Sequence, residues 1–404
     1  MHEAGARVLE KALEGLGRGP LEEPLFCKRN HLPARMESRG LKQKTVRTIL
    51  GEVTFRRSAY QCPVCDHIKY PADELLNISG TGFSPGARRM MARQGAQECF
   101  REGAEGLEFF ANLRVEAKDM ERTAEKTGRL VDDWMREQAS LATLMPPDIE
   151  PEILYIEFDG TGIPVRKKEL AQSKGKEPDG QAHTREAKLG CVFTQTGLDE
   201  NGKPRRDPAS TTYVGAIEPS VDFGYRIRAE AIRRGLLGAK RVVALTDGAA
   251  YNKTIIAEHF PQATHILDYY HATEHLSDFL QEVCHEPGNG ALYDELSGLI
   301  WNGQTEDLIK EMQTRLPRSG KRRKRGEREI NYFKTNAYAM RYGEFREQGL
   351  FIGSGVIEAG CKTVIGKRLK QSGMFWSVQG ANAIIALCCC LISGRFEQFW
   401  EDAA

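Results

Sequence analysis

The sequence lacks a hydrophobic run long enough to cross a bilayer. Its longest uninterrupted apolar stretch extends from Ala383 to Ile392, whereas a membrane-spanning helix needs roughly 18–20 residues. The start, Met1-His2-Glu3, has no basic segment followed by an apolar one, so we expect no secretory signal. Hydrophobic residues make up 40% of the chain, which excludes a disordered or collagen-like protein. We therefore expect a cytoplasmic protein with a packed core and no membrane partner.

An excess of either charge is also missing, since 57 Lys and Arg residues stand against 56 Asp and Glu residues. The basic residues nevertheless gather in three stretches that contain few acids. Each stretch is either a solvated surface or a surface that meets an anionic partner such as phosphate. The three stretches are Lys28–Arg57, Lys321–Arg328 and Lys362–Lys370.

The cysteine pattern of a disulfide scaffold is missing as well. Most of the ten cysteines lie within apolar or helical sequence, where a reduced cytosolic protein keeps them as small core residues. Cys62 and Cys65 differ, because their Cys-Pro-Val-Cys turn can present two thiolates from one knuckle. The cysteines expected to be core residues are Cys99, Cys191, Cys284, Cys361 and Cys388-Cys389-Cys390.

A small hairpin is predicted just before this turn. Residues 45–60 alternate apolar and polar on both sides of Gly51, as two antiparallel strands do. Four ligands in two close pairs then fit a tetrahedral, zinc-ribbon-like site for a structural Zn²⁺ ion. His67 competes for the fourth position, and a hairpin without metal is the alternative. The four ligands are Cys27, His31, Cys62 and Cys65.

Residues 84–145 are expected to be helical. The region begins at Ser84-Pro85, where serine caps the helix and proline fills its first position. Further helices are expected at 116–126 and 128–138. The break around Asn112 fits the turn of a helix-turn-helix that contacts DNA, and it fits equally a plain bundle or linker.

From Ile153 the pattern becomes that of a mixed α/β sheet. Helices are expected at 222–237 and from Lys253, and a polar loop at 166–185. Residues 271–347 are helical again, and two more helices follow. The predicted strands are 153–160, 188–194, 211–217, 241–246 and 265–267.

Three acids are candidates for a metal site. Asp159 and Asp247 each follow an apolar strand and precede a glycine, and strand ends are where ligands bind in α/β sheets. Glu358 opens a helix that also carries several cations. Carboxylates suit Mg²⁺, which supports chemistry on phosphates, whereas an Asp-Gly pair that only ends a strand is the alternative. His271, which follows Asp268, is either part of this site or a structural residue at a helix start.

At these residues the sequence resembles the DDE transposases of bacterial insertion sequences, in particular the ISKra-type group, which is related to Mutator-like elements. The resemblance covers roughly residues 25–400 and includes the hairpin that leads into YQCPVC. The matching segments are YIEFDGTGIPV, VVALTDGAAYN, HILDYYHATEHL, the Trp301-Asn302-Gly303 stretch and IGSGVIEAGCK…RLKQSGMFWS.

The resemblance implies a ribonuclease-H-like core with Asp159 on its first strand, Asp247 after its fourth and Glu358 on a late helix. These acids would hold two Mg²⁺ or Mn²⁺ ions, and His271 would take part in catalysis. The implied reaction is hydrolysis of a phosphodiester at the end of the element, followed by attack of the freed 3′-hydroxyl on target DNA. The implied partners are double-stranded DNA and further copies of the chain, in the bacterial nucleoid.

The implied architecture is an α/β core interrupted by an all-α insertion and preceded by a small zinc-ribbon-like hairpin and a helical DNA-binding region. Basic residues would contact DNA phosphates. These residues are Lys321, Arg322, Arg323, Lys324, Arg325, Lys362, Arg368 and Lys370. The segments are 1–80 for the first helix and hairpin, 81–150 for the helical region, 151–271 and 348–404 for the core, and 272–347 for the insertion.

Two features depart from the family pattern. The first half of the zinc site is not a Cys-x2-Cys pair, and Cys388-Cys389-Cys390 stands where an arginine is expected. All three acids are present. Two other functions also fit the sequence, namely a DNA-binding repressor that no longer cuts and a metal-dependent nuclease without strand transfer.

Overall fold

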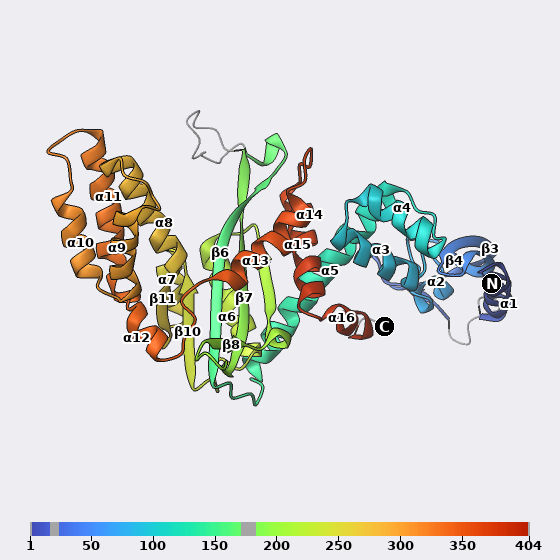
Figure 1. The fold of residues 1–404 in the computed structure, drawn as a ribbon. Coiled ribbons are helices and arrows are strands. Elements are labelled where there is room, and N and C mark those ends of the chain that lie inside the picture. Colours follow the sequence, from blue (N-terminus) through green and yellow to red (C-terminus); the bar gives the residue numbers. More distant parts are fainter. Residues whose placement is uncertain (1, 17–23, 171–182, 403–404) are drawn as a thin grey trace. The chain divides into compact units, whose positions relative to one another are not determined.

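The computed structural model describes residues 2–16, 24–170 and 183–402, so most of the polar loop expected at 166–185 lies outside the described residues. The chain forms two compact units, Met1–Thr127 and Gly128–Ala404. The division falls within one long helix, α5 (Ala117–Leu144). Each unit is described by itself, and both are drawn in Figure 1.

The first unit is built on the predicted hairpin. Strands β3 (Glu37–Thr48) and β4 (Gly51–Gln61) pair antiparallel, and β5 (Ile68–Lys69) adds to β4. Ile49 and Leu50 form the turn, and Gly51, the first residue of β4, has a φ of 116°, which favours glycine. Alternate residues of both strands, including Val53, pack against helix α1 (His2–Leu16). A two-stranded ribbon of β1 (Phe26–Cys27) and β2 (Ala34–Arg35) carries the first cysteine.

Helices complete this unit, and one prediction about them is wrong. Ser84 caps α3 as expected, since its Oγ accepts from the N–H of Ala87 at 3.2 Å. Asn112, in the left-handed conformation, ends α4. The helices expected at 116–126 and 128–138 are a single helix, α5, because one glycine costs a helix only about 1 kcal/mol. The other helices here are α2 (Pro71–Leu75), α3 (Pro85–Gln97) and α4 (Phe100–Ala111).

The second unit contains a six-stranded sheet, as the α/β pattern predicted. The strand order is β11-β10-β6-β7-β8, and β9 pairs with β7. β6, β7 and β9 are antiparallel, whereas β10 and β11 run parallel to β6. The short strand β8 was not predicted, and it makes β10 the fifth strand of the sheet along the chain. The strands are β6 (Ile153–Pro164), β7 (Thr184–Leu198), β8 (Pro204–Arg206), β9 (Thr212–Ala216), β10 (Arg241–Thr246) and β11 (Thr264–Leu267).

Strand β6 extends to Pro164, beyond the predicted end at residue 160, so Asp159 lies within the strand and not at its end. The strand pairs with β7 as far as Pro164 opposite Thr184. Glycine inside a strand usually weakens it. Here a side chain of the partner strand β7 occupies the space that a side chain at the glycine would fill. A Cβ at Gly160 would lie 2.6 Å from the Glu186 side chain. Close packing across the pair therefore explains why Gly160 and Gly162 do not end the strand.

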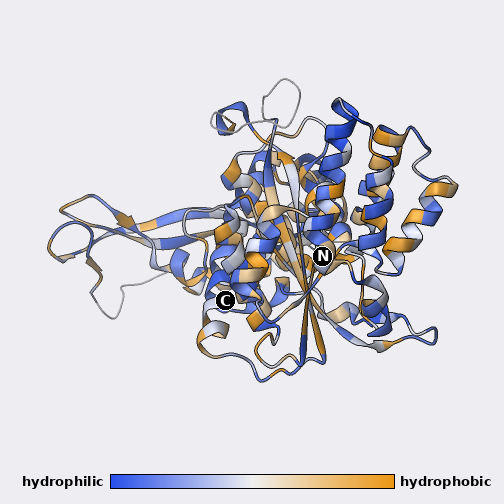
Figure 2. Ribbon diagram, turned by 90° about the vertical axis from the view of Figure 1, so that its left-hand side faces the viewer, coloured by the Kyte–Doolittle hydropathy of each residue, from blue (hydrophilic) through white to orange (hydrophobic). Residues whose placement is uncertain are grey.

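Helices cover both faces of the sheet (Figure 1). Phe158 contacts Phe223 of α6 on one face, and Glu157 contacts the start of α13 on the other. Figure 2 shows hydrophobic residues concentrated in the strands between these layers. The first layer holds α6 (Ser220–Arg233) and α7 (Ala250–His259). The second holds α13 (Gly355–Gly360), a π-helical turn (Cys361–Gly366), α14 (Lys367–Leu369) and α15 (Val378–Ile392), before α16 (Phe396–Asp402).

A helical segment separates β11 from α13, as predicted for residues 271–347. It begins and ends at neighbouring points, because the N–H of Tyr269 donates to the carbonyl of Ile352 at 2.9 Å. Its helices pack on one another. They are α8 (Tyr269–Phe279) with a π-helical turn (Leu280–Cys284), α9 (Ala291–Trp301), α10 (Thr305–Thr314), α11 (Lys321–Asn336) and α12 (Tyr342–Glu347). A short 3₁₀ turn at Ala337–Ala339 lies between α11 and α12, and two others, Lys167–Glu169 and Pro208–Ser210, lie outside this segment.

Within the described residues, no single helix is both long and apolar enough to span a membrane. One pair, α15 with α16, passes that test of length and composition only when taken together, and it is bent by 104°. Cys388, Cys389 and Cys390 of α15 are all buried. The three cysteines are therefore core residues and offer no surface for DNA where an arginine was expected.

Replacing Gly128 is expected to destabilise the second unit. A Cβ at this position would overlap the backbone carbonyl of Ala383 in α15, which cannot move aside as a flexible side chain would. Gly128→Ala should lower the free energy of unfolding by about 3 kcal/mol, measured by urea denaturation. Gly298→Ala is the control, because nothing lies within 4 Å of a Cβ there. It should gain about 0.5–1 kcal/mol, and equal effects of the two changes would contradict the packing described.

Candidate functional site

Three aspartates stand side by side on the sheet. Parallel pairing sets Thr246 of β10 opposite Phe158 of β6 and opposite Leu267 of β11. The residues that follow these three are Asp159, Asp247 and Asp268. Because neighbours in register point to the same face of a sheet, the three carboxylates share the face covered by α13.

Glu358 comes to this face from the helix above it. It lies in the first turn of α13, which packs on β6 and β7. One ligand atom each from Asp268, His271 and Glu358 lie within 4.8 Å of one another. This acidic group contains two predicted site residues, His271 and Glu358, and a third residue, Asp268, to which the sequence analysis gave no catalytic role. Asp159 approaches the same helix one turn later, where its Oδ2 is 3.8 Å from the Sγ of Cys361.

Asp268 uses both carboxylate oxygens to hold backbone. Its Oδ1 accepts from the N–H of His271 at 2.7 Å, which caps α8. Its Oδ2 accepts from the N–H of Ser354, the residue before α13. The side chain is fully buried. Asp268 thus fixes His271 and the start of the Glu358 helix relative to each other, and an aspartate just before a helix is the sequence signal for such a cap.

Glu157 is a second acid that sequence reasoning missed. It is fully buried, and its Oε2 accepts from the N–H of Ile357 at 2.9 Å. Burial raises the pKa of Glu157 to about 8, against the opposing bond from Ile357, with the charges of Asp268 and Glu358 adding to the rise. The available signal was its position two residues before Asp159, which places both on the same face of β6. Glu157 and Asp268 together hold α13, and thereby Glu358.

The electrostatics of the site favour a cation. Burial raises the pKa of Asp159; the negative charge of Asp247 adds to the rise, while the N–H of Gly160 and the nearby His271 oppose it. Asp247 is oriented by the N–H of Ala249, which donates to its Oδ1 at 3.1 Å, and by the side-chain amide of Asn252. A carboxylate whose pKa is raised partly by a neighbouring carboxylate, as that of Asp159 is, is stabilised in its charged form when a positive charge binds beside it.

His271 is partly exposed, with 37% of its side chain accessible. Its Nδ1 lies 3.2 Å from the Oε2 of Glu274 on the next turn of α8. The ring therefore has a carboxylate beside one nitrogen while it lies close to Asp268 and Glu358. The backbone of His271 takes part in the helix cap, and a nitrogen of its ring lies within 4.8 Å of carboxylate oxygens of Asp268 and Glu358.

The cations after Glu358 divide into exposed and buried residues. Lys362, Lys367 and Lys370 are exposed, and Lys370 Nζ donates to Thr161 Oγ1 on β6. Arg368 is only 1% exposed, and its guanidinium lies 5.2 Å from the centre of the Trp376 ring. The prediction that Arg368 contacts DNA is therefore wrong, because a buried guanidinium packed on tryptophan cannot reach a phosphate.

The basic stretch at the start of α11 is partly engaged within the protein. Arg322 donates to the carbonyl of Val283. Arg323 pairs with Glu327 at 2.8 Å, and Arg325 pairs with Glu282 at 3.1 Å. No such contact is recorded for Lys321 or Lys324 within the described residues. All five are exposed or half-buried, so they form a surface on the helical segment.

A second group of ligand atoms lies in the first unit. Cys27 Sγ is 3.8 Å from Cys65 Sγ, while His31 Nε2 is 3.3 Å from Cys65 Sγ and 3.5 Å from Cys62 Sγ. All four atoms are within 4.8 Å of one another. The other ring nitrogen, His31 Nδ1, is 2.7 Å from the carbonyl of Leu32, which fixes the ring. His67 is outside this group, and its carbonyl instead accepts from the N–H of Cys62.

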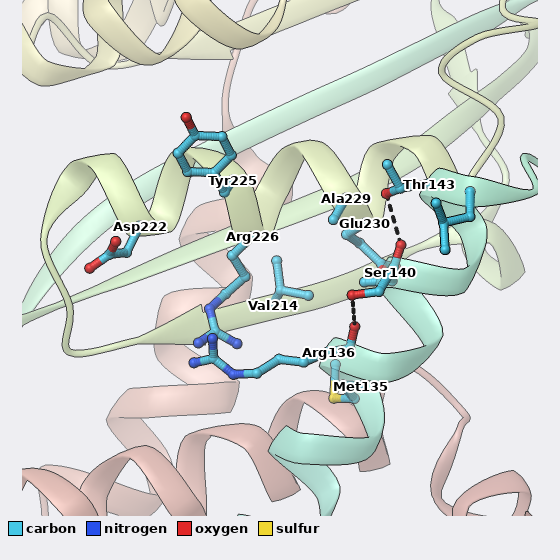
Figure 3. Close-up of a pocket in the computed structure, with 12 residues that line it drawn as sticks. Met135, Arg136, Ser140, Thr143, Val214, Asp222, Tyr225, Arg226, Ala229 and Glu230 are labelled. Carbon is cyan, nitrogen blue, oxygen red and sulfur yellow. Dashed lines mark hydrogen bonds between the residues drawn. The ribbon is translucent and has the colours of Figure 1, made fainter.

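Among the cavities that the described residues of the second unit enclose, two hold about 620 Å³ each. One lies between α5 and α6 and is shown in Figure 3, with Arg136 and Ser140 on one side and Tyr225 and Arg226 on the other. None of the predicted site residues lines it. The other cavity borders the loop before α13, next to the acidic group.

No protein-family model matches the chain. The chain is 22% identical over 373 residues to a UPF0236 protein in the vanSb 3′ region of Streptococcus gallolyticus, which covers 90% of this chain and 76% of that protein. A search of solved structures finds the Drosophila P element transposase strand transfer complex, with 11% identity over 82% of this chain and 84% of that chain and a TM-score of 0.26. The first is a weak homologue, and a TM-score this low does not establish a shared fold.

Glu157→Gln is expected to remove a pH dependence of stability. The pKa of Glu157 is about 8 in the folded protein, against 4.5 for an ordinary glutamate. Between these values the folded state keeps a proton that the unfolded state has lost, so rising pH destabilises the fold by up to about 1.4 kcal/mol per pH unit. Urea unfolding in EDTA should show this decline in the parent protein and a smaller one in the variant. The difference between the two isolates Glu157, and parallel curves would contradict a raised pKa.

Proposed function

We propose that the protein is a DNA transposase of the DDE type. The observation that carries the proposal is the placement of Asp159 on β6 and of Asp247 directly after β10, the parallel strand beside it, with Glu358 on the helix that packs over them. The reaction is hydrolysis of a phosphodiester at the end of an element, followed by transfer of the 3′-hydroxyl to target DNA. The matched sequence segments support an ISKra-type relative, and the sheet order supports a ribonuclease-H-like core interrupted by α8–α12.

The residues present fit a divalent metal. They offer oxygen ligands, and the pKa of Asp159 is raised partly because Asp247 is close. Asp159, Asp247 and Glu358 would hold two Mg²⁺ or Mn²⁺ ions. Such ions, when bound, make water a better nucleophile and stabilise charge on a phosphate. Asp268 is a positioning residue in this proposal, because both of its oxygens already accept backbone N–H groups.

The protein's own groups orient the reaction. Glu157 and Asp268 hold the start of α13 so that Glu358 cannot turn away from the sheet. His271 faces the same space and can donate a ring N–H to a phosphate oxygen. Exposed Lys362 and Lys370 neutralise the DNA backbone beside the acids.

DNA is the partner that the basic surfaces fit. The stretch from Lys321 to Arg325 and the exposed lysines after Glu358 supply phosphate contacts, which give affinity without sequence choice. The hairpin and the helices up to residue 150 supply further contacts to the ends of the element. Joining two ends to one target requires at least two copies of the chain.

Zn²⁺ is the ion that fits the group in the first unit. Two thiolates on a tetrahedral Zn²⁺ are about 3.8 Å apart, and a thiolate and an imidazole nitrogen about 3.5 Å, given the usual bond lengths. The separations in the structure are 3.8 Å for Cys27 and Cys65, 3.5 Å for His31 and Cys62 and 3.3 Å for His31 and Cys65. Three sulfur atoms and one nitrogen make a closed, structural set that replaces part of a core in a small hairpin domain.

Glu358→Gln is expected to abolish cutting while DNA binding persists. The change keeps the shape of the side chain and removes one charge from the metal site, so cleavage of supercoiled plasmid carrying candidate element ends in Mg²⁺ should slow at least about a hundredfold. Glu347→Gln, on the exposed end of α12, is the control and should cut like the parent.

Equal cleavage by parent and Glu358→Gln would show that Glu358 is not needed. Supplying ends that are already cut then separates transposase from nuclease, because only a transposase joins them to target DNA. A parent protein that binds but neither cuts nor joins would favour a repressor.

Zinc analysis tests the other site. The purified protein is expected to contain about one equivalent of zinc, and Cys62→Ser should lose it and expose the first unit to proteolysis. His67→Ala should keep both the zinc and the protection, because its ring lies outside the ligand group. Loss of zinc in His67→Ala would mean that His67, and not His31, completes the site.

A further inference from the structure

Helix α8 carries two histidines on one face. His271 and His275 are four residues apart, which places their side chains one helical turn from each other on the same side of the helix. Two histidines at this spacing on a helix can bind a single metal ion. The side chains of both are 37% accessible. An ion from solvent can therefore reach the two rings.

Each ring has a carboxylate beside its Nδ1 atom. His271 Nδ1 lies 3.2 Å from Glu274 Oε2, and His275 Nδ1 lies 2.6 Å from Glu329 Oε2. Within the part of the chain that the structure describes, no hydrogen bond to the Nε2 atom of either ring is recorded. A histidine that binds a metal usually donates its other ring N–H to a carboxylate, which fixes the tautomer. Both rings have this arrangement, and it leaves Nε2 as the free nitrogen.

The surroundings of His275 hold its ring in place. Glu329 is buried, with 4% of its side chain accessible, and its Oε1 accepts from Arg328 at 2.7 Å. Burial raises the pKa of Glu329, but the hydrogen bonds from His275 and Arg328 outweigh burial, so the pKa lies below its usual value. Tyr332 stacks on the His275 ring, with ring centres 3.6 Å apart. A charged carboxylate thus orients the edge of the imidazole, and an aromatic ring supports its face.

The two nitrogen atoms suit a different class of metal from the acids nearby. Imidazole nitrogen binds Zn²⁺, Cu²⁺ and Ni²⁺ well, whereas Mg²⁺ takes oxygen ligands. A ring nitrogen of His271 lies within 4.8 Å of carboxylate oxygens of Asp268 and Glu358. An ion on the histidines would therefore lie beside the acidic group without needing its oxygen atoms.

We propose that His271 and His275 bind one divalent transition-metal ion through their Nε2 atoms, with solvent in its remaining coordination positions. Glu274 and Glu329 would be the carboxylates that orient the two rings. Binding of this ion does not depend on the DNA chemistry proposed above, since it uses neither Asp159 nor Asp247. The ion is also separate from the Zn²⁺ assigned to the cysteines of the first unit.

Nickel binding by calorimetry tests the site. The full-length protein is used without a histidine tag, and excess Mg²⁺ is present to occupy the carboxylates. The parent should bind about one equivalent more Ni²⁺ than His275→Ala does. Glu329→Gln, which keeps the shape of the side chain, should bind Ni²⁺ about tenfold more weakly because the orienting charge is lost. Glu327→Gln is the matched control on the exposed side of α11, and it should bind like the parent.

A second measurement uses the parent protein alone, so it does not depend on whether a variant folds. Diethylpyrocarbonate modifies accessible imidazoles, and mass spectrometry identifies the modified residues. Ni²⁺ should protect His271 and His275 from modification. His285, an exposed histidine of the same helical segment, should be modified equally with and without Ni²⁺.

The results separate this metal site from the proposed function. Equal Ni²⁺ binding by the parent and His275→Ala, or modification of His275 that Ni²⁺ does not reduce, overturns the site even if Glu358-dependent cutting is found. Loss of one equivalent in His275→Ala, weaker binding in Glu329→Gln but not in Glu327→Gln, and protection of both histidines support it even if no cutting is found.

Discussion

The parallel register of β6, β10 and β11 is the constraint on which the acidic site depends. Carboxylates repel one another, and side chains on flexible loops would turn apart. Backbone hydrogen bonds between strands hold Asp159, Asp247 and Asp268 in one row. Burial raises the pKa of Asp159, and the negative charge of Asp247, which the strands keep beside it, adds to the rise. The sheet stores an unfavourable interaction that a bound cation relieves.

The site also requires that Glu358 stays over the row of aspartates. Two buried carboxyl groups hold it there. Glu157 and Asp268 reach from the sheet to two N–H groups at the start of α13. The first N–H groups of a helix have no partner within the helix, so each of these bonds satisfies a donor that would otherwise be lost to burial. Glu157 and Asp268 thus orient Glu358, the residue that the proposal assigns to the metal, and need not bind an ion themselves.

Local sequence pattern predicted what depends on neighbours along the chain. The hairpin around Gly51, the cap at Ser84, β10 and the acids Asp159 and Asp247 were all visible from periodicity or from Asp-Gly pairs. What it missed depends on distant partners. The length of β6 is set by pairing with β7, and the continuity of α5 was hidden by Gly128, whose reason lies in α15. The burial of Arg368 and the role of Glu157 likewise follow from contacts across the fold.

The helical segment α8–α12 leaves and rejoins the sheet at one point, where Tyr269 bonds Ile352 and Asp268 bonds Ser354. A loop whose two ends already touch adds little strain to the structure that carries it, and lengthening such a loop costs little further entropy. Evolution can therefore replace, lengthen or shorten these helices without changing the strand order of the sheet. The chain between β11 and α13 is a place where new surfaces can be acquired while Asp159, Asp247 and Glu358 keep their positions.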